Sequence, residues 1–129
     1  MRASLTRTVM TIKSQLVGTT TILRVHGTMT AAAGERGLRD VIRQAVADGV
    51  RTVIVNMQDA TSIDSSGVSD LASGHMILGN SGGSLKLCGL TKKLKDIFVV
   101  TRLYSVFDIH ETEAAALASV EAAPKQSNS

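Results

Sequence analysis

The sequence has few of the residues that form disulfide cross-links and no apolar run that could anchor the chain in a membrane. Its 129 residues include one cysteine, Cys88, and one proline, Pro124. A lone cysteine has no partner within the chain, so no disulfide framework is expected, and no run of about 18 apolar residues exists that could span a bilayer. Both absences favour a reducing, cytoplasmic compartment and no membrane contact.

Aromatic residues are scarce as well, at 2% of the chain with no tryptophan. Basic residues outnumber acidic ones by 14 to 11, for a net charge of +3, but they are scattered from Arg2 to Lys125 without aromatic residues interleaved. Nucleic-acid binding gains little support from this pattern. The densest basic cluster, at 91–95, has helical apolar spacing, so we interpret its lysines as a solvated helix face, with contact to an acidic partner as the alternative.

Metal ligands and targeting signals are also missing. Three histidines and one cysteine show no close ligand spacing, so we predict neither a metal site nor a cofactor. The first eight residues are partly basic, but the stretch that follows is interrupted by Thr11, Lys13 and Gln15. No secretory h-region forms there, and we predict no targeting peptide.

A chain of this length fits one domain, and folding can bury roughly two thirds of the surface that the unfolded chain exposes. We predict that residues 1–123 form this domain and that the polar stretch 124–129 is disordered. There is no internal repeat. No heptad pattern or long apolar stripe requires a dimer, so the oligomeric state stays open.

Apolar spacing predicts alternating strands and helices. Loose alternation on both sides of Gly18 predicts a hairpin, and short apolar runs predict buried strands of a parallel sheet. The expected strands are 9–16, 21–26, 53–55, 85–88 and 106–109. Cys88 lies between apolar neighbours in one of them, so we expect a buried, inert thiol. Helical spacing predicts helices from Thr30 onward to near Gly49, after Asp64 to about Asn80, over 92–100 and over 112–122. This order predicts an α/β fold with a mixed, mostly parallel sheet of four to five strands and about four helices.

The most informative motif is Asp59-Ala60-Thr61-Ser62-Ile63-Asp64-Ser65-Ser66-Gly67. We predict a loop here that leaves the C-terminal end of a central strand and opens a helix, at the edge where α/β proteins gather their sites. One interpretation is a cap only, since Asp64 or Ser65 can satisfy the free N–H groups of the helix. The other is a modification site, because two hydroxyls stand at an exposed corner beside Gly67, which lets another backbone approach closely.

A phosphate at this corner would act on a partner more than on the fold. It adds about −1.5 to −2 charges, which the helix dipole favours by about 0.3–1 kcal/mol. An acidic or desolvated partner surface would instead be repelled, at a cost of several kcal/mol. The corner could therefore switch a complex without a large conformational change.

Several motifs together resemble the anti-sigma factor antagonist family, which has the STAS fold. The matching segments are Asn56-Met57, Ile63-Asp64-Ser65-Ser66-Gly67, Gly82-Gly83 ahead of Leu85-Lys86-Leu87, Leu94-Lys95-Asp96-Ile97-Phe98 and Leu103-Tyr104-Ser105-Val106-Phe107. The resemblance covers about residues 9–120. It implies a bacterial signalling protein that regulates transcription through protein–protein contacts and is not an enzyme.

The resemblance also implies roles for residues. Ser65, directly after the aspartate, would be phosphorylated by an anti-sigma factor that is also a GHKL-type serine kinase, and a PP2C-type phosphatase would reverse this. The unphosphorylated chain would bind the anti-sigma factor and free the sigma factor. The implied partner-binding residues are Thr30, Ile63, Asp64, Ser65, Ser66, Gly67, Ser69 and Asp70.

One departure from the family keeps an alternative open. Many members have Gly-Glu-Leu-Asp after the second strand, where this chain has Gly27-Thr28-Met29-Thr30. Thr30 can cap the first helix but cannot supply the negative charge. The alternative is a STAS module that binds a transporter, a stress-sensing assembly or a small molecule without phosphorylation.

An enzyme is the weaker rival. It would use Ser65 or Ser66 as nucleophile and His26 as base. The chain has no Gly-x-Ser-x-Gly elbow, no third residue to orient the histidine and no second polar loop for an oxyanion hole. We therefore expect no catalytic site.

Overall fold

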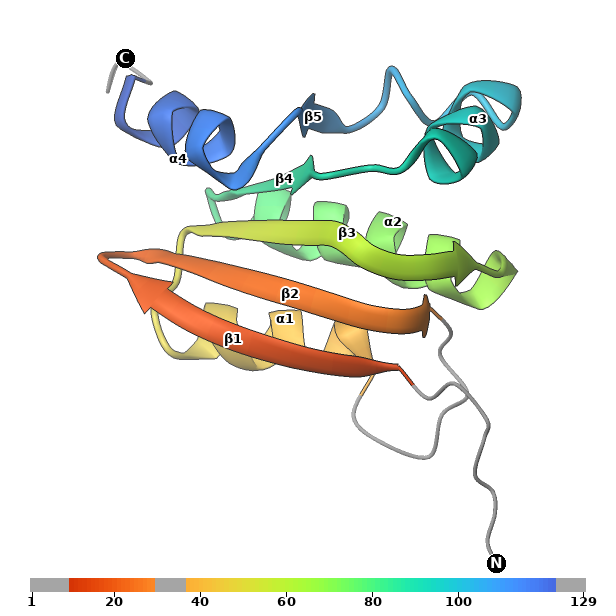
Figure 1. Cartoon of the computed structure of the whole chain (residues 1–129). Helices are drawn as coiled ribbons and strands as arrows, with labels where there is room; N and C mark the ends of the chain where they lie inside the picture. Colours follow the sequence, from red (N-terminus) through yellow and green to blue (C-terminus); the bar gives the residue numbers. More distant parts are fainter. Residues whose placement is uncertain (1–9, 30–36, 123–129) are drawn as a thin grey trace, which may run out of the picture.

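A computed structural model describes residues 10–29 and 37–122. The elements follow one another as β1 (Thr11–Val17), β2 (Thr20–Met29), α1 (Leu38–Ala47), β3 (Thr52–Ile63), α2 (Ser65–Asn80), β4 (Ser84–Cys88), α3 (Lys92–Val100), β5 (Asp108–His110) and α4 (Glu113–Ala122). In the described residues the strands form one five-stranded sheet in the order β1-β2-β3-β4-β5 (Figure 1). The β1–β2 pair is antiparallel and the other pairs are parallel. The predicted mixed α/β sheet with four helices is confirmed.

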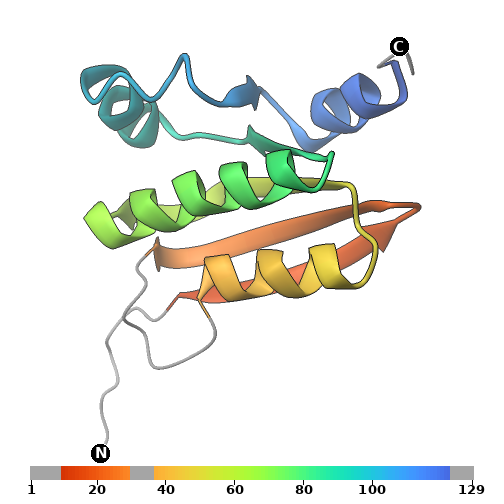
Figure 2. The same cartoon turned by 180° about the vertical axis from the view of Figure 1, so that it is seen from behind.

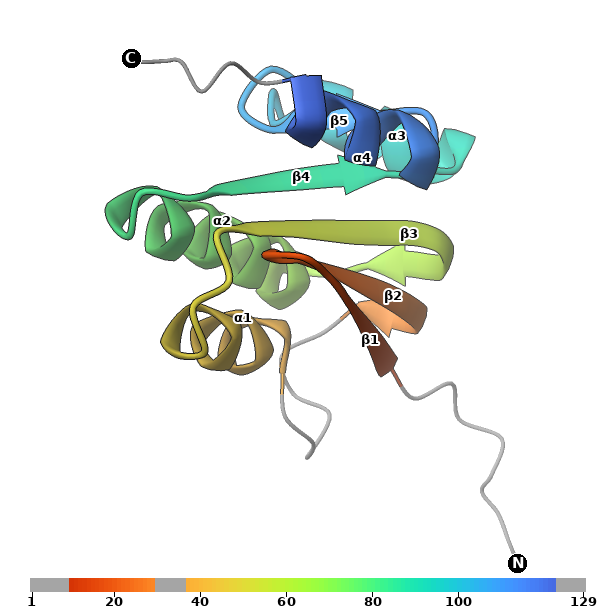
Figure 3. The ribbon, with the colours of Figure 1, turned by 90° about the vertical axis from the view of Figure 1, so that its left-hand side faces the viewer.

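The helices cover the two faces of the sheet unequally. Helices α1 and α2 lie side by side on one face (Figure 2). Seen from the side, α4 lies away from α1 and α2, near β4 and β5 (Figure 3). Successive residues of a strand point to opposite faces. Leu23 and Val55 therefore pack toward α1 and α2 in the main core, whereas Ile22 and Ile54 join a small cluster under α4.

The third strand is much longer than its sequence suggests. The apolar run predicted only residues 53–55, followed by a loop from Asp59 onward, but β3 continues to Ile63. The predicted loop is therefore wrong. The reason is that β2 also continues, to Met29, and pairs with β3 through two register shifts. Backbone hydrogen bonds between these strands do not require apolar side chains, so polar residues such as Thr61 and Ser62 continue the strand.

The other elements agree with prediction to within a few residues, with one notable shift. The last strand was predicted at 106–109 and lies at Asp108–His110. Phe107 precedes it because its ring is buried against Phe98, at a centroid distance of 5.9 Å. The predicted tail at 124–129 and the start of the first predicted helix, at 30–36, lie outside the described residues. No helix in the described ranges has the length and apolar character needed to cross a bilayer.

Candidate functional site

Asp64 is the residue that starts helix α2. Its backbone is extended, and its Oδ1 accepts a hydrogen bond from the Gly67 N–H at 2.8 Å, which is the geometry of a helix N-cap. The same oxygen accepts a second hydrogen bond, from the Ser66 hydroxyl at 2.7 Å. The Asp64 N–H donates to the Met29 carbonyl at 3.1 Å, which ties the start of α2 to the end of β2. The predicted cap is confirmed, with Asp64 in that role.

Gly67 is buried against the chain's own backbone. A Cβ atom at this position would collide with the Met29 carbonyl oxygen and would lie 2.9 Å from Cγ1 of Ile63. The expected close approach of another backbone at this glycine is confirmed, and that backbone belongs to the chain's own β2. The role of Gly67 in lining a partner contact stays a prediction. Within the chain, its role is to let the first turn of α2 dock onto the sheet.

Ser65 stands at the exposed start of this docked helix. It is the first residue of α2, its side chain is exposed, and its hydroxyl makes no hydrogen bond within the described residues. Ser69 lies one turn further along the helix and is also exposed, on the same side as Ser65. Ser66 is half-buried, with its hydroxyl held by Asp64. Of the two adjacent serines, Ser65 is therefore the accessible one.

Asp70 differs from our expectation. We placed it on the exposed face of α2, but its side chain is 5% exposed. Its Oδ2 would lie 3.2 Å from a Cβ atom added to Gly37, the N-cap residue of α1. Because Gly37 offers no side-chain cap, the partial positive charge at this helix start favours the carboxylate. The predicted exposure of Asp70 is wrong, and the residue lies at the interface of α1 and α2.

The remaining predicted residues flank this corner. Ile63 is the last residue of β3, half-buried and paired with Met29. Thr30 lies outside the described residues. Within the described ranges, no three or more His, Cys, Asp and Glu side chains gather to hold a metal ion.

The geometry does not assemble the serine–histidine pair of the enzyme hypothesis. The Ser66 hydroxyl donates a hydrogen bond to Asp64. Among the described residues, no hydrogen bond joins His26 of β2 to Ser65 or Ser66. His26 is exposed and lies opposite Asp59 in the β2–β3 pairing.

A polar network on the opposite face was not anticipated. Glu113, the first residue of α4, accepts two hydrogen bonds from the Arg24 guanidinium, at 2.7 and 2.9 Å, and one from the Asn56 amide at 2.6 Å. The hydrogen bonds from Arg24 hold the pKa of Glu113 below its usual value, although burial opposes them. Arg24 and Glu113 are 89 residues apart, and neither stands in a recognisable motif. No local signal in the sequence could have joined them.

Cys88 lies close to this network, under α4. Its side chain is fully buried in the small cluster with Ile22, Ile54 and Ala116. Burial, reinforced by the nearby charge of Glu113, raises the pKa of the thiol to about 11. The predicted burial of this cysteine is confirmed. Because the thiolate is the reactive form of cysteine, the raised pKa makes the thiol less reactive.

Several solved structures share this fold. The SpoIIAA anti-sigma factor antagonist in its unphosphorylated form shares 23% identity over 87% of this chain and 99% of its own, with a TM-score of 0.69. The Bacillus cell fate determinant SpoIIAA in its phosphorylated form shares 24% identity over 85% and 99% of the chains, with a TM-score of 0.67. An anti-sigma factor antagonist from Mycobacterium paratuberculosis shares 20% over 87% and 94%, with a TM-score of 0.74.

The sequence itself carries the signature of the same fold. Residues 11–116 match the STAS domain family, a stretch that runs from the first residue of β1 into α4. The matched region includes the Asp64 cap, the docked glycine and the exposed serine between them. The chain therefore belongs to the STAS domain family.

Proposed function

We propose that this protein is an anti-sigma factor antagonist whose partner binds at the start of α2 and is released when Ser65 is phosphorylated. The observation that carries the proposal is the exposure of the Ser65 hydroxyl at a helix start that is otherwise fixed, by the Asp64 cap and by the close docking of Gly67. The structural relatives described above support it, because they are anti-sigma factor antagonists and one was solved in both phosphorylated and unphosphorylated forms.

The geometry favours a change in surface charge over a change in fold. The backbone N–H groups at the start of α2 and the helix dipole favour a phosphate there. Asp64, whose Oδ1 already accepts two hydrogen bonds, adds a second negative charge nearby. A bound partner would face both charges, and about 1.4 kcal/mol of repulsion weakens a complex tenfold. The proposed partner is a GHKL-type anti-sigma kinase in the cytoplasm, with a PP2C-type phosphatase to reset the switch.

The test is intact-mass analysis after incubation with the cognate anti-sigma kinase and ATP. We expect one added phosphate on the wild type and on Ser69→Ala, which removes an exposed hydroxyl from the same helix face, and none on Ser65→Ala. If Ser65→Ala still gains a phosphate, the phosphorylated residue is not Ser65. If no variant gains phosphate while the kinase complex still forms, the switch is wrong and a constitutive binder remains.

The second candidate is a STAS module that uses this corner without phosphorylation. The observation that favours it is Thr30, which cannot supply the acid that many family members have at that position. The buried Asp70 does not supply it at the surface either, since its carboxylate faces the start of α1. The same mass experiment separates the two candidates.

A further inference from the structure

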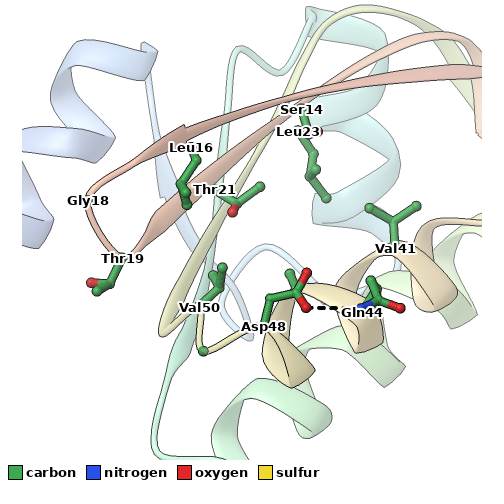
Figure 4. Close-up of a pocket in the computed structure, with 12 residues that line it drawn as sticks. Ser14, Leu16, Gly18, Thr19, Thr21, Leu23, Val41, Gln44, Asp48 and Val50 are labelled. Carbon is green, nitrogen blue, oxygen red and sulfur yellow. Dashed lines mark hydrogen bonds between the residues drawn. The ribbon is translucent and has the colours of Figure 1, made fainter.

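A crevice at the far end of the sheet from Ser65 has the features of a peptide-binding groove. Its volume is about 360 Å³. It lies between the β1–β2 hairpin and α1 (Figure 4). Ser65 follows the end of β3, whereas the crevice adjoins the turn at Gly18, where β2 begins. A partner in the crevice would therefore leave the Ser65 corner accessible.

The two walls of the crevice present regular stripes of side chains. From α1 come Val41, Gln44, Ala45 and Asp48, at the spacing of one helix face. From the hairpin come two cross-strand pairs, Ser14 opposite Leu23 and Leu16 opposite Thr21. A helix and a strand edge that flank a crevice with aliphatic side chains on both walls can accept an extended peptide, which adds to the sheet and places alternate side chains between the walls.

The edge of the sheet at β1 is open to such an addition. In the described part of the chain β1 pairs with β2 alone and is an edge strand, with a regular register throughout its seven residues. Natural edge strands are usually protected by bulges, prolines or several charges. This one has a single charge, Lys13, while Leu16 is 65% exposed and lies on the crevice.

Two polar groups in the crevice are available to a ligand. Thr21 is 8% exposed, and its hydroxyl makes no hydrogen bond within the described residues although it lines the cavity. Buried hydroxyls are usually satisfied, so this one is available to a ligand. The Asp48 carboxylate accepts a hydrogen bond from the Gln44 amide at 3.1 Å, but no cation among the described residues pairs with it.

Asp48 also marks where a positive charge would bind. It is the C-cap residue of α1, whose last turn contains no basic residue. The partial negative charge of the helix C-terminus adds to that of the carboxylate, so both favour a cation at this end of the crevice. The Asp48 carboxylate therefore favours a basic residue in the ligand, and the aliphatic side chains on the walls of the crevice favour apolar residues.

We propose that the crevice between β1 and α1 binds an extended segment of a partner protein. This segment would add a strand to β1, place aliphatic side chains against Leu16 and Val41, and direct a lysine or arginine to Asp48.

The test is selection from a phage-displayed library of random dodecapeptides on the full-length chain. We expect enriched peptides to combine alternating aliphatic residues with a basic residue, and to shift the amide NMR signals of β1. In titrations of the best synthetic peptide, Leu16→Glu and Asp48→Lys each weaken binding at least tenfold. Selection on Asp48→Lys should enrich acidic residues in place of basic ones.

Matched controls keep the result specific. Val100→Glu places the same change at another exposed apolar residue, 79% exposed on α3, and Asp59→Lys reverses another exposed carboxylate. Both should alter affinity less than twofold. The proposal is overturned if no peptide is enriched, or if the enriched peptides bind Leu16→Glu and Asp48→Lys as well as the wild type.

Two further outcomes would overturn the proposal by showing that this chain itself, and not a partner protein, occupies the crevice. If Arg2→Glu with Arg7→Glu raises peptide affinity tenfold, residues 1–9 compete for the crevice and are its occupant. If sedimentation velocity shows a dimer that Leu16→Glu dissociates, a second copy is the occupant. A monomer with unchanged affinity in the double variant supports the partner peptide.

Discussion

The two faces of the sheet are built by different means. On the face covered by α1 and α2, fully buried side chains from both helices and three strands form one continuous core, with Leu71 and Leu23 among them. On the face covered by α4, a cluster centred on Ile22, Ile54 and Cys88 is small, and the start of the helix is attached by the Arg24–Glu113 pair. Hydrophobic stabilisation scales with buried apolar area, so the first face should provide most of the stability.

This difference explains where the candidate switch lies. The Ser65 corner belongs to the well-packed face, and its backbone is fixed by the Asp64 cap and the contact of Gly67 with β2. A modification there changes the charge on a rigid surface.

Truncation of a buried leucine should distinguish the faces most strongly. We expect Leu71→Ala, in the main core, to lower the free energy of unfolding by about 2–5 kcal/mol. Leu117→Ala, at the partly buried margin of the α4 cluster, should cost less than half as much. Denaturant titration measures both. Equal losses would show that the α4 face contributes as much stability as the main core.

Two glycines of α2 form a matched pair. Gly67→Ala drives a methyl group into the Met29 carbonyl and should cost about 1–3 kcal/mol, since backbone must move. Gly79→Ala, in the last turn of the same helix with nothing within 4 Å, should instead stabilise the protein by about 0.5–1 kcal/mol.

Thermal unfolding of the two variants measures both changes in stability. A Gly67→Ala variant as stable as the wild type would mean that the first turn of α2 is not tightly docked. The account of a rigid Ser65 corner would then lose its structural basis.

The thiol under α4 gives a smaller, pH-dependent effect. The pKa of Cys88 is about 11 in the folded chain, above the ordinary value of 9.0, so the unfolded chain releases the proton first as pH rises. The free energy of unfolding should fall between about pH 9 and 11, by up to about 1.4 kcal/mol per pH unit more than in Cys88→Ala. Parallel curves for the two proteins would indicate a thiol that reaches solvent.

The Arg24–Glu113 pair should show the smallest effect and the opposite sign of pH dependence. The pKa of Glu113 is lowered in the folded chain, so its contribution is present above its ordinary pKa of 4.5 and is lost as pH falls through the folded value. Acid titration of wild type and Glu113→Gln should show the steeper loss in the wild type. Ala114→Gln, an exposed neighbour in α4, should retain the wild-type slope.

The sequence predicted the features that depend on neighbouring residues. Asp64 and the Gly67 N–H that it caps lie within one helical turn, so the local sequence is enough to predict this cap. The α/β fold followed from the order of apolar runs, and the STAS family was implied by the resemblance of several motifs along the chain. Cys88, between apolar neighbours, was correctly expected to be buried.

Features that depend on distant elements were missed. The inward position of Asp70 depends on where α1 begins beside α2, and no periodicity of α2 alone reveals this. The extent of β3 depends on a partner strand thirty-odd residues earlier that continues through polar residues. The same holds for the backbone that packs against Gly67, which belongs to β2. Each of these three features depends on how whole helices and strands pack against one another, and the propensities of single residues do not predict that packing.

The central claim is that charge at Ser65, and not a change of fold, controls partner binding. It is tested most directly by the dissociation constant for the cognate anti-sigma kinase, measured by titration calorimetry on the unphosphorylated and Ser65-phosphorylated chains. The account predicts at least a hundredfold weaker binding after phosphorylation, with unchanged circular dichroism and with Ser69→Ala binding like the wild type. Equal affinity of the two forms would contradict it.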